Sequence, residues 1–336
     1  MKKTLFVVLS LLLVSAFGLR NSVQQFLQQP LLLTGPYLEI KAGSSLRQLC
    51  SEWQQQQLLS AGDCTFLKFL SVLKPELRDI KAGVYAVSSM PLNAQLALFR
   101  SGKVAQFSLL LREGWTLKQN LQSIINAPFL INDVSDDTQV ASMWQWPQGW
   151  GKSPINGEGL ILPDTYFYTA NTKASTIISR AHKSLLAAVD TAWQQRNPDI
   201  PLASPYELLI LASIIEKETG FLPEKPLISS VFINRLRQGM RLQTDPTVIY
   251  GLGDRYRGDI TRAHLRDPHI YNTYVHAGLP PGPIALVSKT SLQAAAQPEI
   301  SDKLFFVAKG DGRHQFSASL QQHNQAVQQY IFGKKP

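Results

Sequence analysis

The sequence has few charged residues, and this shortage argues against a disordered protein. Charged residues make up only 17% of the 336 residues, whereas 44% are hydrophobic, so the chain can bury a full core and is not expected to be disordered. The net charge is +9, but the basic residues are scattered, without a Lys/Arg block, a zinc-finger or an RNP signature. We therefore expect no nucleic acid partner. We find no internal repeat, and the length predicts two domains.

Cysteine and histidine are also scarce. The only cysteines are Cys50 and Cys64, and the six histidines show no triad or metal-ligand spacing. We therefore expect no metal and no other cofactor. In an oxidising compartment the two cysteines could form a disulfide, which would contribute about 3 kcal/mol by closing a short loop. Two buried free thiols are the alternative, and the sequence leaves both open.

The one long hydrophobic run lies at the N-terminus. Lys2 and Lys3 precede an uncharged apolar stretch at residues 4–19, and Arg20 follows. This pattern is typical of an export signal, with the lysines in the cytoplasm and the body of the protein exported. The stretch is slightly shorter than the roughly 20 residues of a spanning helix, and residues 14–16 offer a signal-peptide cleavage pattern. A cleaved signal and an uncleaved anchor at residues 1–20 both fit, and we favour the anchor.

Residues 37–103 are expected to form a small subdomain, after a Gln-rich, Pro-containing linker at residues 21–36. Hydrophobic periodicity and capping residues predict its elements. These are a strand at 37–43, a helix capped by Ser44 or Ser45, a helix capped by Asp63, a strand at 80–87 and a helix ending at Gly102. The βααβ order of the first four resembles a LysM-like module, a fold that in many proteins binds GlcNAc-containing glycans.

Residues 104–336 are expected to form a larger domain that mixes helices with strands, which makes the whole chain α+β. Residues 156–175 are predicted to be a loop with aromatics, and residues 240–284 a long region rich in Pro, Gly and aromatic residues. The other predicted elements are a strand, turn and helix at 107–124, helices at 176–196, 204–220, 226–239, 291–298 and 323–332, and a β-hairpin at 303–319.

The helix predicted at 204–220 ends in the sequence IIEKETGF, which carries Glu216 and Glu218. Ser204 and Pro205 suit its N-cap and first position, and Gly220 suits a left-handed residue after its end. At 3.6 residues per turn the two glutamates lie about 200° apart around the axis, so they point in nearly opposite directions.

Glu218 continues an apolar stripe formed by Leu211, Ile214 and Ile215. Burial and the negative end of the helix dipole both disfavour a charged carboxylate there, so we expect a raised pKa. A raised pKa suits a general acid that protonates a glycosidic oxygen. A solvated carboxylate at a fraying helix end is the alternative. We interpret Glu216 as structural and paired with an arginine.

Several segments resemble known families. The sequence KETGF is similar to the Glu-Ser-Gly-Phe signature of soluble lytic transglycosylases and goose-type lysozymes, with Thr219 where Ser is usual. More closely, ASIIEKETG, VFINRLRQGMRLQTDPTVIYG, YNTY, GLPPGPI, EGLILPDTYFYT and KAGVYAV resemble the YceG-like family of endolytic murein transglycosylases (MltG). The resemblance runs from the apolar stretch to near the C-terminus.

This resemblance implies a lyase that cuts nascent peptidoglycan strands internally, with Glu218 as the general acid and base. It would cleave MurNAc-β-1,4-GlcNAc bonds, leave 1,6-anhydroMurNAc ends and terminate strand elongation. The resemblance also implies a single-pass protein of the bacterial inner membrane, with a cytoplasmic N-terminus and a periplasmic catalytic domain at residues 104–336. Its expected partners are glycan strands and the membrane. Peptidoglycan synthases and elongation or division complexes are the candidate protein partners.

Four further residues are candidates for substrate binding. Gln243, Asn272 and Tyr274 have donors and acceptors suited to N-acetyl and hydroxyl groups, although Gln243 and Asn272 could instead brace their loops. Asp245 is the best second carboxylate for a hydrolase, which would place it about 5–5.5 Å from the acid if retaining and about 6.5–9.5 Å if inverting. A turn residue before Pro246 is its alternative role. A muramidase and a non-enzymatic wall-binding scaffold are the alternative functions.

Overall fold

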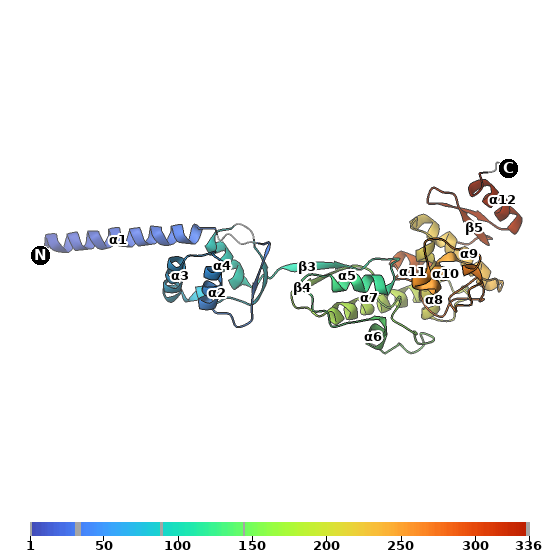
Figure 1. Cartoon of the computed structure of the whole chain (residues 1–336), viewed down its shortest axis with the longest axis horizontal. Coiled ribbons are helices and arrows are strands. Elements are labelled where there is room, and N and C mark those ends of the chain that lie inside the picture. Colours follow the sequence, from blue (N-terminus) through green and yellow to red (C-terminus); the bar gives the residue numbers. More distant parts are fainter. Residues whose placement is uncertain (1, 31–34, 88–89, 144, 334–336) are drawn as a thin grey trace. The chain divides into compact units, whose positions relative to one another are not determined.

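The computed structural model describes residues 2–30, 35–87, 90–143 and 145–333. The chain divides into two compact units, unit 1 at residues 1–107 and unit 2 at residues 108–336, close to the predicted boundary at 103/104. Both units combine helices with small two-stranded sheets (Figure 1), which confirms the mixed α and β class. The boundary between the units falls inside strand β3 (Gln106–Leu110).

Unit 1 is built on the predicted order of strand, helix, helix and strand. Its elements are α1 (Lys2–Gln28), β1 (Tyr37–Ile40), α2 (Leu46–Gln55), α3 (Ala61–Leu73), β2 (Gly83–Ala86) and α4 (Leu92–Ser101). Strands β1 and β2 are antiparallel, with Tyr37 opposite Ala86. Gly102 ends α4 in the left-handed conformation, as predicted.

Serine residues cap both central helices of unit 1. Ser45 caps α2, which confirms one of the two predicted candidates. The prediction that Asp63 caps α3 is wrong, because Ser60 is the N-cap and Asp63 is the third helical residue. The Asp63 carboxylate accepts a hydrogen bond from the Ser60 backbone N–H at 3.0 Å, and the two residues form a capping box.

The predicted linker is partly helical, because α1 continues through Gln28. Phe26 is buried in the core of unit 1, and its ring lies edge-on to Phe66 with 5.0 Å between the centroids. Val23 and Leu27 pack against the same core, so residues 21–28 belong to unit 1. Residues 31–34 of the predicted linker lie outside the described residues, as do residue 1 and the side chains of residues 2–6, 8 and 9 in the predicted anchor.

In the part of the chain that the structure describes, no helix combines the length and the apolar character needed to cross a membrane.

Cys50 and Cys64 are neighbours in the core of unit 1 and are not joined. The Cys64 thiol donates a hydrogen bond to the Cys50 carbonyl oxygen at 3.0 Å. Burial raises the pKa of the Cys50 thiol to about 12, and the neighbouring Cys64 adds to the shift. Of the two alternatives that the sequence left open, the structure has the free thiols.

Unit 2 is organised around helix α8, whose residues 208–215 are all buried. Helices α7, α9, α10 and α11 pack against it or against one another around it. After β3, its elements are α5 (Leu117–Ile125), α6 (Asp137–Ser142), β4 (Thr165–Thr169), α7 (Ala174–Gln194), α8 (Pro205–Glu218), α9 (Lys225–Arg237), α10 (Asp245–Leu252), α11 (Lys289–Ala296), β5 (Phe305–Ala308), β6 (His314–Ser317) and α12 (Leu320–Tyr330).

Two of these elements occupy regions that the sequence analysis expected to be irregular. Strand β4 pairs with β3 inside the predicted aromatic loop, where Tyr166 and Tyr168 are buried and the residues beside them are exposed. This is the alternation of a half-buried strand. Helix α10 begins with Asp245 and Pro246, and a proline in the first turn of a helix sacrifices no hydrogen bond. The predicted C-terminal hairpin is confirmed, because β5 and β6 are antiparallel.

Gly159 is a position in unit 2 where the backbone and the packing together require glycine. Its φ is +72°, and a Cβ atom there would lie 2.5 Å from Cβ of Pro283, whereas Gly114 has a similar φ of +71° with open space around it. We predict that Gly159→Ala lowers the free energy of unfolding by about 1–3 kcal/mol more than Gly114→Ala does, because only the former overpacks the core. Thermal and urea unfolding of both variants measure this, and equal losses would contradict the overpacking argument.

Candidate active site

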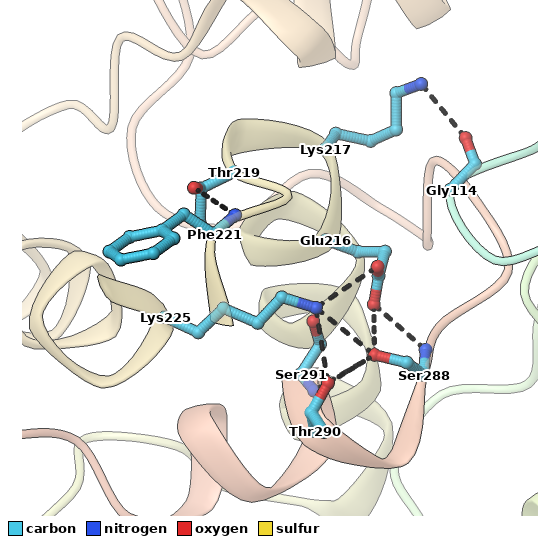
Figure 2. A network of polar contacts seen from close by, with 9 residues as sticks. All are labelled: Gly114, Glu216, Lys217, Thr219, Phe221, Lys225, Ser288, Thr290 and Ser291. Atoms are coloured by element: carbon cyan, nitrogen blue, oxygen red, sulfur yellow. Dashed lines mark hydrogen bonds and ion pairs between the residues drawn. The ribbon is translucent and has the colours of Figure 1, made fainter. Parts of the chain in front are cut away.

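Helix α8 begins as the sequence predicts and ends differently. Pro205 is its first residue, and the Ser204 hydroxyl oxygen accepts a hydrogen bond from the Glu207 backbone N–H at 3.3 Å. Thr219 follows the helix in an extended conformation, with φ −146° and ψ 135°. The predicted left-handed Gly220 is wrong, since Gly220 has no positive φ. The chain turns instead through a hydrogen bond from the Phe221 N–H to the Thr219 hydroxyl at 3.0 Å (Figure 2).

Glu216 points into a closed polar network (Figure 2). Its carboxylate lies 3.2 Å from Nζ of Lys225, and the side chains of Glu216 and Lys225 are only 6% and 2% exposed. The Ser288 backbone N–H also donates to it at 2.9 Å. The predicted arginine partner is wrong, because a lysine on the next helix occupies this place. The structural interpretation of Glu216 agrees with these contacts.

The Glu216 network joins three helices. Lys225 is the first residue of α9, and its ammonium group also donates to the hydroxyls of Ser288 and Thr290 at 3.3 Å each. Ser288 is the N-cap of α11. Burial alone would raise the pKa of Glu216, but the hydrogen bonds from the Ser288 hydroxyl and backbone and the charge of Lys225 outweigh it and hold the pKa below its usual value. Glu216 is therefore charged at neutral pH and unable to act as an acid.

Glu218 lies instead in a cleft of about 350 Å³. Five segments supply its walls: the end of α8, a residue of α9, the loop that leads into α10, the loop that carries Tyr274, and the C-terminal hairpin with α12. The lining residues are Glu218, Arg235, Leu242, Gln243, Thr244, Asp245, Tyr274, Phe305, Phe306, Leu320 and His323. The lining thus combines two carboxyl groups with the apolar side chains of two phenylalanines and two leucines.

The Glu218 carboxyl is partly buried and has one strong partner. The Thr244 hydroxyl donates a short hydrogen bond to its Oε1. Burial raises the pKa of Glu218 to about 7, and the negative charge of Asp245 adds to the shift, while Thr244 and Arg235 act in the opposite direction. The direction is the one that the sequence predicted. Because Thr244 occupies Oε1 as a donor, the other carboxyl oxygen is left to carry the proton.

Asp245 and Tyr274 lie together in the lining of the cleft. The Tyr274 hydroxyl donates a hydrogen bond to Oδ1 of Asp245 at 2.7 Å, and Asp245 is the first residue of α10. Asp245 is exposed and lines the cleft. Gln243 is also exposed, and its φ of +47° places it in the left-handed region. These three predicted residues are brought together with Glu218.

Asn272 does not line this cleft. Its side chain is 1% exposed, and its amide nitrogen donates to the backbone carbonyls of His264, Leu265 and Asp267 at 2.8–3.3 Å. Its amide oxygen accepts from the Tyr274 backbone N–H at 2.9 Å. We therefore assign Asn272 the loop-bracing role that the sequence left as the alternative, and we withdraw it as a substrate contact.

Several lining residues were missed by the sequence analysis. Arg235 is buried, and its guanidinium donates to the carbonyls of Leu242 and Leu304 at 2.7 Å, so it ties α9 to the loop before Thr244 and to the start of β5. The position of Arg235 among the apolar residues of FINRLR could have indicated a buried arginine. Nothing in the sequence places Phe305 or His323 beside a glutamate some 90 residues away.

Among the described residues, no group of three or more His, Cys, Asp and Glu side chains gathers in a way that could hold a metal ion.

The sequence model of the YceG-like family matches residues 38–329 of this chain. The chain is also similar to two proteins named endolytic murein transglycosylase. One, from Bacillus subtilis (strain 168), is 38% identical over 184 residues, which are 54% of this chain and 50% of that protein. The other, from Streptococcus pneumoniae serotype 2 (strain D39 / NCTC 7466), is 26% identical over 328 residues, which are 88% of this chain and 58% of that protein. The chain thus spans little more than half of the length of these relatives.

A solved structure has a similar fold. The 2.6 Å crystal structure of a putative YceG-like protein from Listeria monocytogenes superposes with a TM-score of 0.54 at 29% sequence identity. The match covers 86% of this chain and 98% of the Listeria chain. The similarity therefore extends over both units rather than over the cleft alone.

Removing the charge partner of Glu216 and neutralising Glu218 should affect stability differently. We predict that Lys225→Met lowers the free energy of unfolding by about 3–5 kcal/mol, because it leaves Glu216 buried and uncompensated. Glu218→Gln, by contrast, replaces a carboxyl that is already half neutral at pH 7 and should leave the thermal unfolding midpoint unchanged or higher. Calorimetry at pH 7 compares them, and a stable Lys225→Met protein would contradict the assignment of Glu216 as a charged structural residue.

Proposed function

The chain belongs to the YceG-like family, and on this premise we propose that it is an endolytic lytic transglycosylase of peptidoglycan. Its substrate is the β-1,4 bond between MurNAc and GlcNAc inside a glycan strand, and cleavage terminates elongation of that strand. One observation carries the proposal: a carboxyl group, Glu218, lines a cleft of polar and apolar residues and has a pKa raised to about 7. The names of its relatives in Bacillus and Streptococcus support the reaction class.

Glu218 alone can supply both proton transfers. Protonated Glu218 donates its proton to the glycosidic oxygen as the bond to the MurNAc anomeric carbon breaks. The resulting carboxylate then takes the proton of the MurNAc C6 hydroxyl, and O6 bonds to the anomeric carbon. The products are a GlcNAc end with a free hydroxyl and a 1,6-anhydroMurNAc end, and Glu218 is protonated again. No water enters the products, because the nucleophile is a hydroxyl of the substrate. The reaction therefore requires no second catalytic carboxylate.

The surroundings of Glu218 suit this cycle. The Thr244 hydroxyl can donate to Oε1 in both protonation states, so it fixes the carboxyl while the proton leaves and returns. The negative charge of Asp245 in the same cleft favours the positive charge that develops at the anomeric carbon. Gln243 is exposed in the same cleft and is placed to meet sugar polar groups.

A muramidase remains the second candidate, because Asp245 is a further, exposed carboxylate residue on the same cleft. The apolar lining residues favour the lyase, since apolar walls limit the water that can enter the cleft; they are Leu242, Phe305, Phe306 and Leu320.

The proposal includes the setting of the enzyme. Two lysines ahead of an uncharged stretch at residues 4–19 support a single-pass anchor in the inner membrane, with a cytoplasmic N-terminus and a periplasmic body. The βααβ order of unit 1 supports a LysM-like role in holding glycan. Peptidoglycan synthases and the elongation or division complexes are the proteins whose product this activity would cut, and they are the partners that we propose.

The strand ends formed by the purified protein test the reaction. We expect wild-type protein to release 1,6-anhydroMurNAc ends from uncrosslinked glycan strands, as measured by mass spectrometry, and Glu218→Gln to lower the rate by roughly 10²–10⁴-fold, the usual contribution of a general acid. Asp245→Asn should slow the reaction but keep the anhydro ends. Reducing MurNAc ends that vanish in Asp245→Asn would assign a muramidase, and full cellular function of Glu218→Gln would favour the scaffold.

The pH dependence tests the role of Thr244. Since the first step requires protonated Glu218, we expect kcat/KM to fall as the pH rises through about 7. Removing the Thr244 hydroxyl removes a bond that lowers the pKa, so Thr244→Val should move this falling limb to higher pH. Thr244→Ser keeps the hydroxyl and is the matched control, which should retain the wild-type profile. Identical profiles for the Val and Ser variants would contradict the assignment.

A further inference from the structure

Helix α3 of unit 1 has an apolar surface that the packing of the unit does not use. Phe69, Val72 and Leu73 are 51%, 63% and 61% exposed. The spacing i, i+3 and i+4 puts them on one face of the helix, and we call these three residues the α3 patch. The opposite face carries Cys64 and Leu67, which are buried in the core. Helix α3 is therefore apolar on both faces, and only one face is covered within unit 1.

The exposed face continues toward the start of the helix. A shallow, open hollow there is lined by Ala61, Gly62, Thr65, Phe66 and Phe69. The small residues leave the two phenylalanine rings accessible from the side of the patch. Large contiguous apolar surfaces on a folded unit mark contacts with a partner or with a membrane.

The position of α3 beside α1 indicates that the α3 patch contacts a membrane rather than a protein partner. Phe66 of α3 contacts Phe26 of α1, so the two helices are joined next to the patch. Arg20, where the apolar stretch of α1 ends, lies six residues before Phe26, or about 9 Å along the helix axis. If residues 4–19 lie in a bilayer, the patch lies at the level of its headgroups. In Figure 1, α3 is on the side of unit 1 nearer the N-terminal part of α1.

The charges beside the patch also suit a lipid surface. Lys68 precedes Phe69 on α3, and Lys74 follows Leu73 at the end of the helix. Glu76 and Asp79 come later, in and after the short turn of helix at Pro75–Arg78. Basic residues that flank exposed aromatic and aliphatic side chains are the composition of helices that lie in the interface of an anionic bilayer.

We propose that the α3 patch inserts into the headgroup region of the bilayer that holds α1, so that unit 1 rests on the lipid surface instead of moving freely at the end of α1. This inference rests on the membrane placement given in the proposed function. It assigns to unit 1 a second contact with lipid, in addition to the N-terminal helix, and it commits Phe69, Val72 and Leu73 to acyl chains rather than to glycan.

A fluorescent label at the patch tests the inference in the full-length chain. Val72→Cys is labelled with NBD, which is selective because Cys50 and Cys64 are buried. Ser51→Cys, at an exposed position on α2 of the same unit, is the matched control. Each protein is reconstituted into vesicles of phosphatidylethanolamine and phosphatidylglycerol, with and without brominated acyl chains. Thermal unfolding confirms that the variants fold as the wild type does.

We expect NBD at position 72 to shift to the blue and to lose most of its emission in brominated vesicles, and NBD at position 51 to be unaffected. Adding Phe69→Asp to the Val72→Cys protein should abolish the quenching. Equal behaviour of the two labels would overturn the inference, as would a response of position 72 to soluble glycan strands or to dimerisation in detergent. Co-flotation of unlabelled protein with vesicles tests the anchor separately: flotation without quenching at position 72 rejects the patch alone, and absence of flotation rejects the membrane placement itself.

Discussion

The burial of helix α8 governs the chemistry of the site. Two carboxyl groups two residues apart leave the end of one buried helix on different sides, and both are at least partly buried. Glu216 meets the ammonium group of Lys225 and the Ser288 hydrogen bonds, so its pKa falls. Glu218 meets a single hydroxyl and a neighbouring negative charge, so its pKa rises to about 7. The same helix thus holds a charged structural carboxylate and an acid that can exchange its proton at neutral pH.

A buried set of threonines keeps the one donor to Glu218 in place. The Thr244 backbone N–H donates to the Thr273 hydroxyl at 3.1 Å, and the Thr247 hydroxyl donates to the Thr244 carbonyl oxygen at 2.7 Å. Thr244, Thr247 and Thr273 are all at most 2% exposed. The carboxyl of Glu218 is therefore held by a rigid support, and a fixed geometry lets the acid act without first reorganising its neighbours.

Local patterns in the sequence were sufficient for most of the helices and for the N-terminal strand pair. Capping residues such as Ser45 and Ser204 lie within three residues of the groups that they bind, so the information is local. The predictions that failed relied on the same local patterns. Asp63 looked like a cap because it is acidic and early in the helix. Strand β4 was hidden because the apolar Phe167 occupies an exposed position, which masks the alternation of apolar and polar residues. The α1 helix continued past its expected end because Phe26 packs into a core formed by residues far along the chain.

The sequence by itself determined that Glu216 and Glu218 diverge and that Glu218 ends an apolar stripe, because helical periodicity fixes directions around an axis. It also determined the resemblance that the comparisons then showed. Only the tertiary structure decided which groups each carboxyl meets. Lys225, Thr244 and the hairpin residues Phe305 and Phe306 reach the site through folding of distant segments, and Asn272 turns into its own loop for the same reason. The direction in which a side chain points around the helix axis is a local property, whereas the partners that shift its pKa are set by long-range packing.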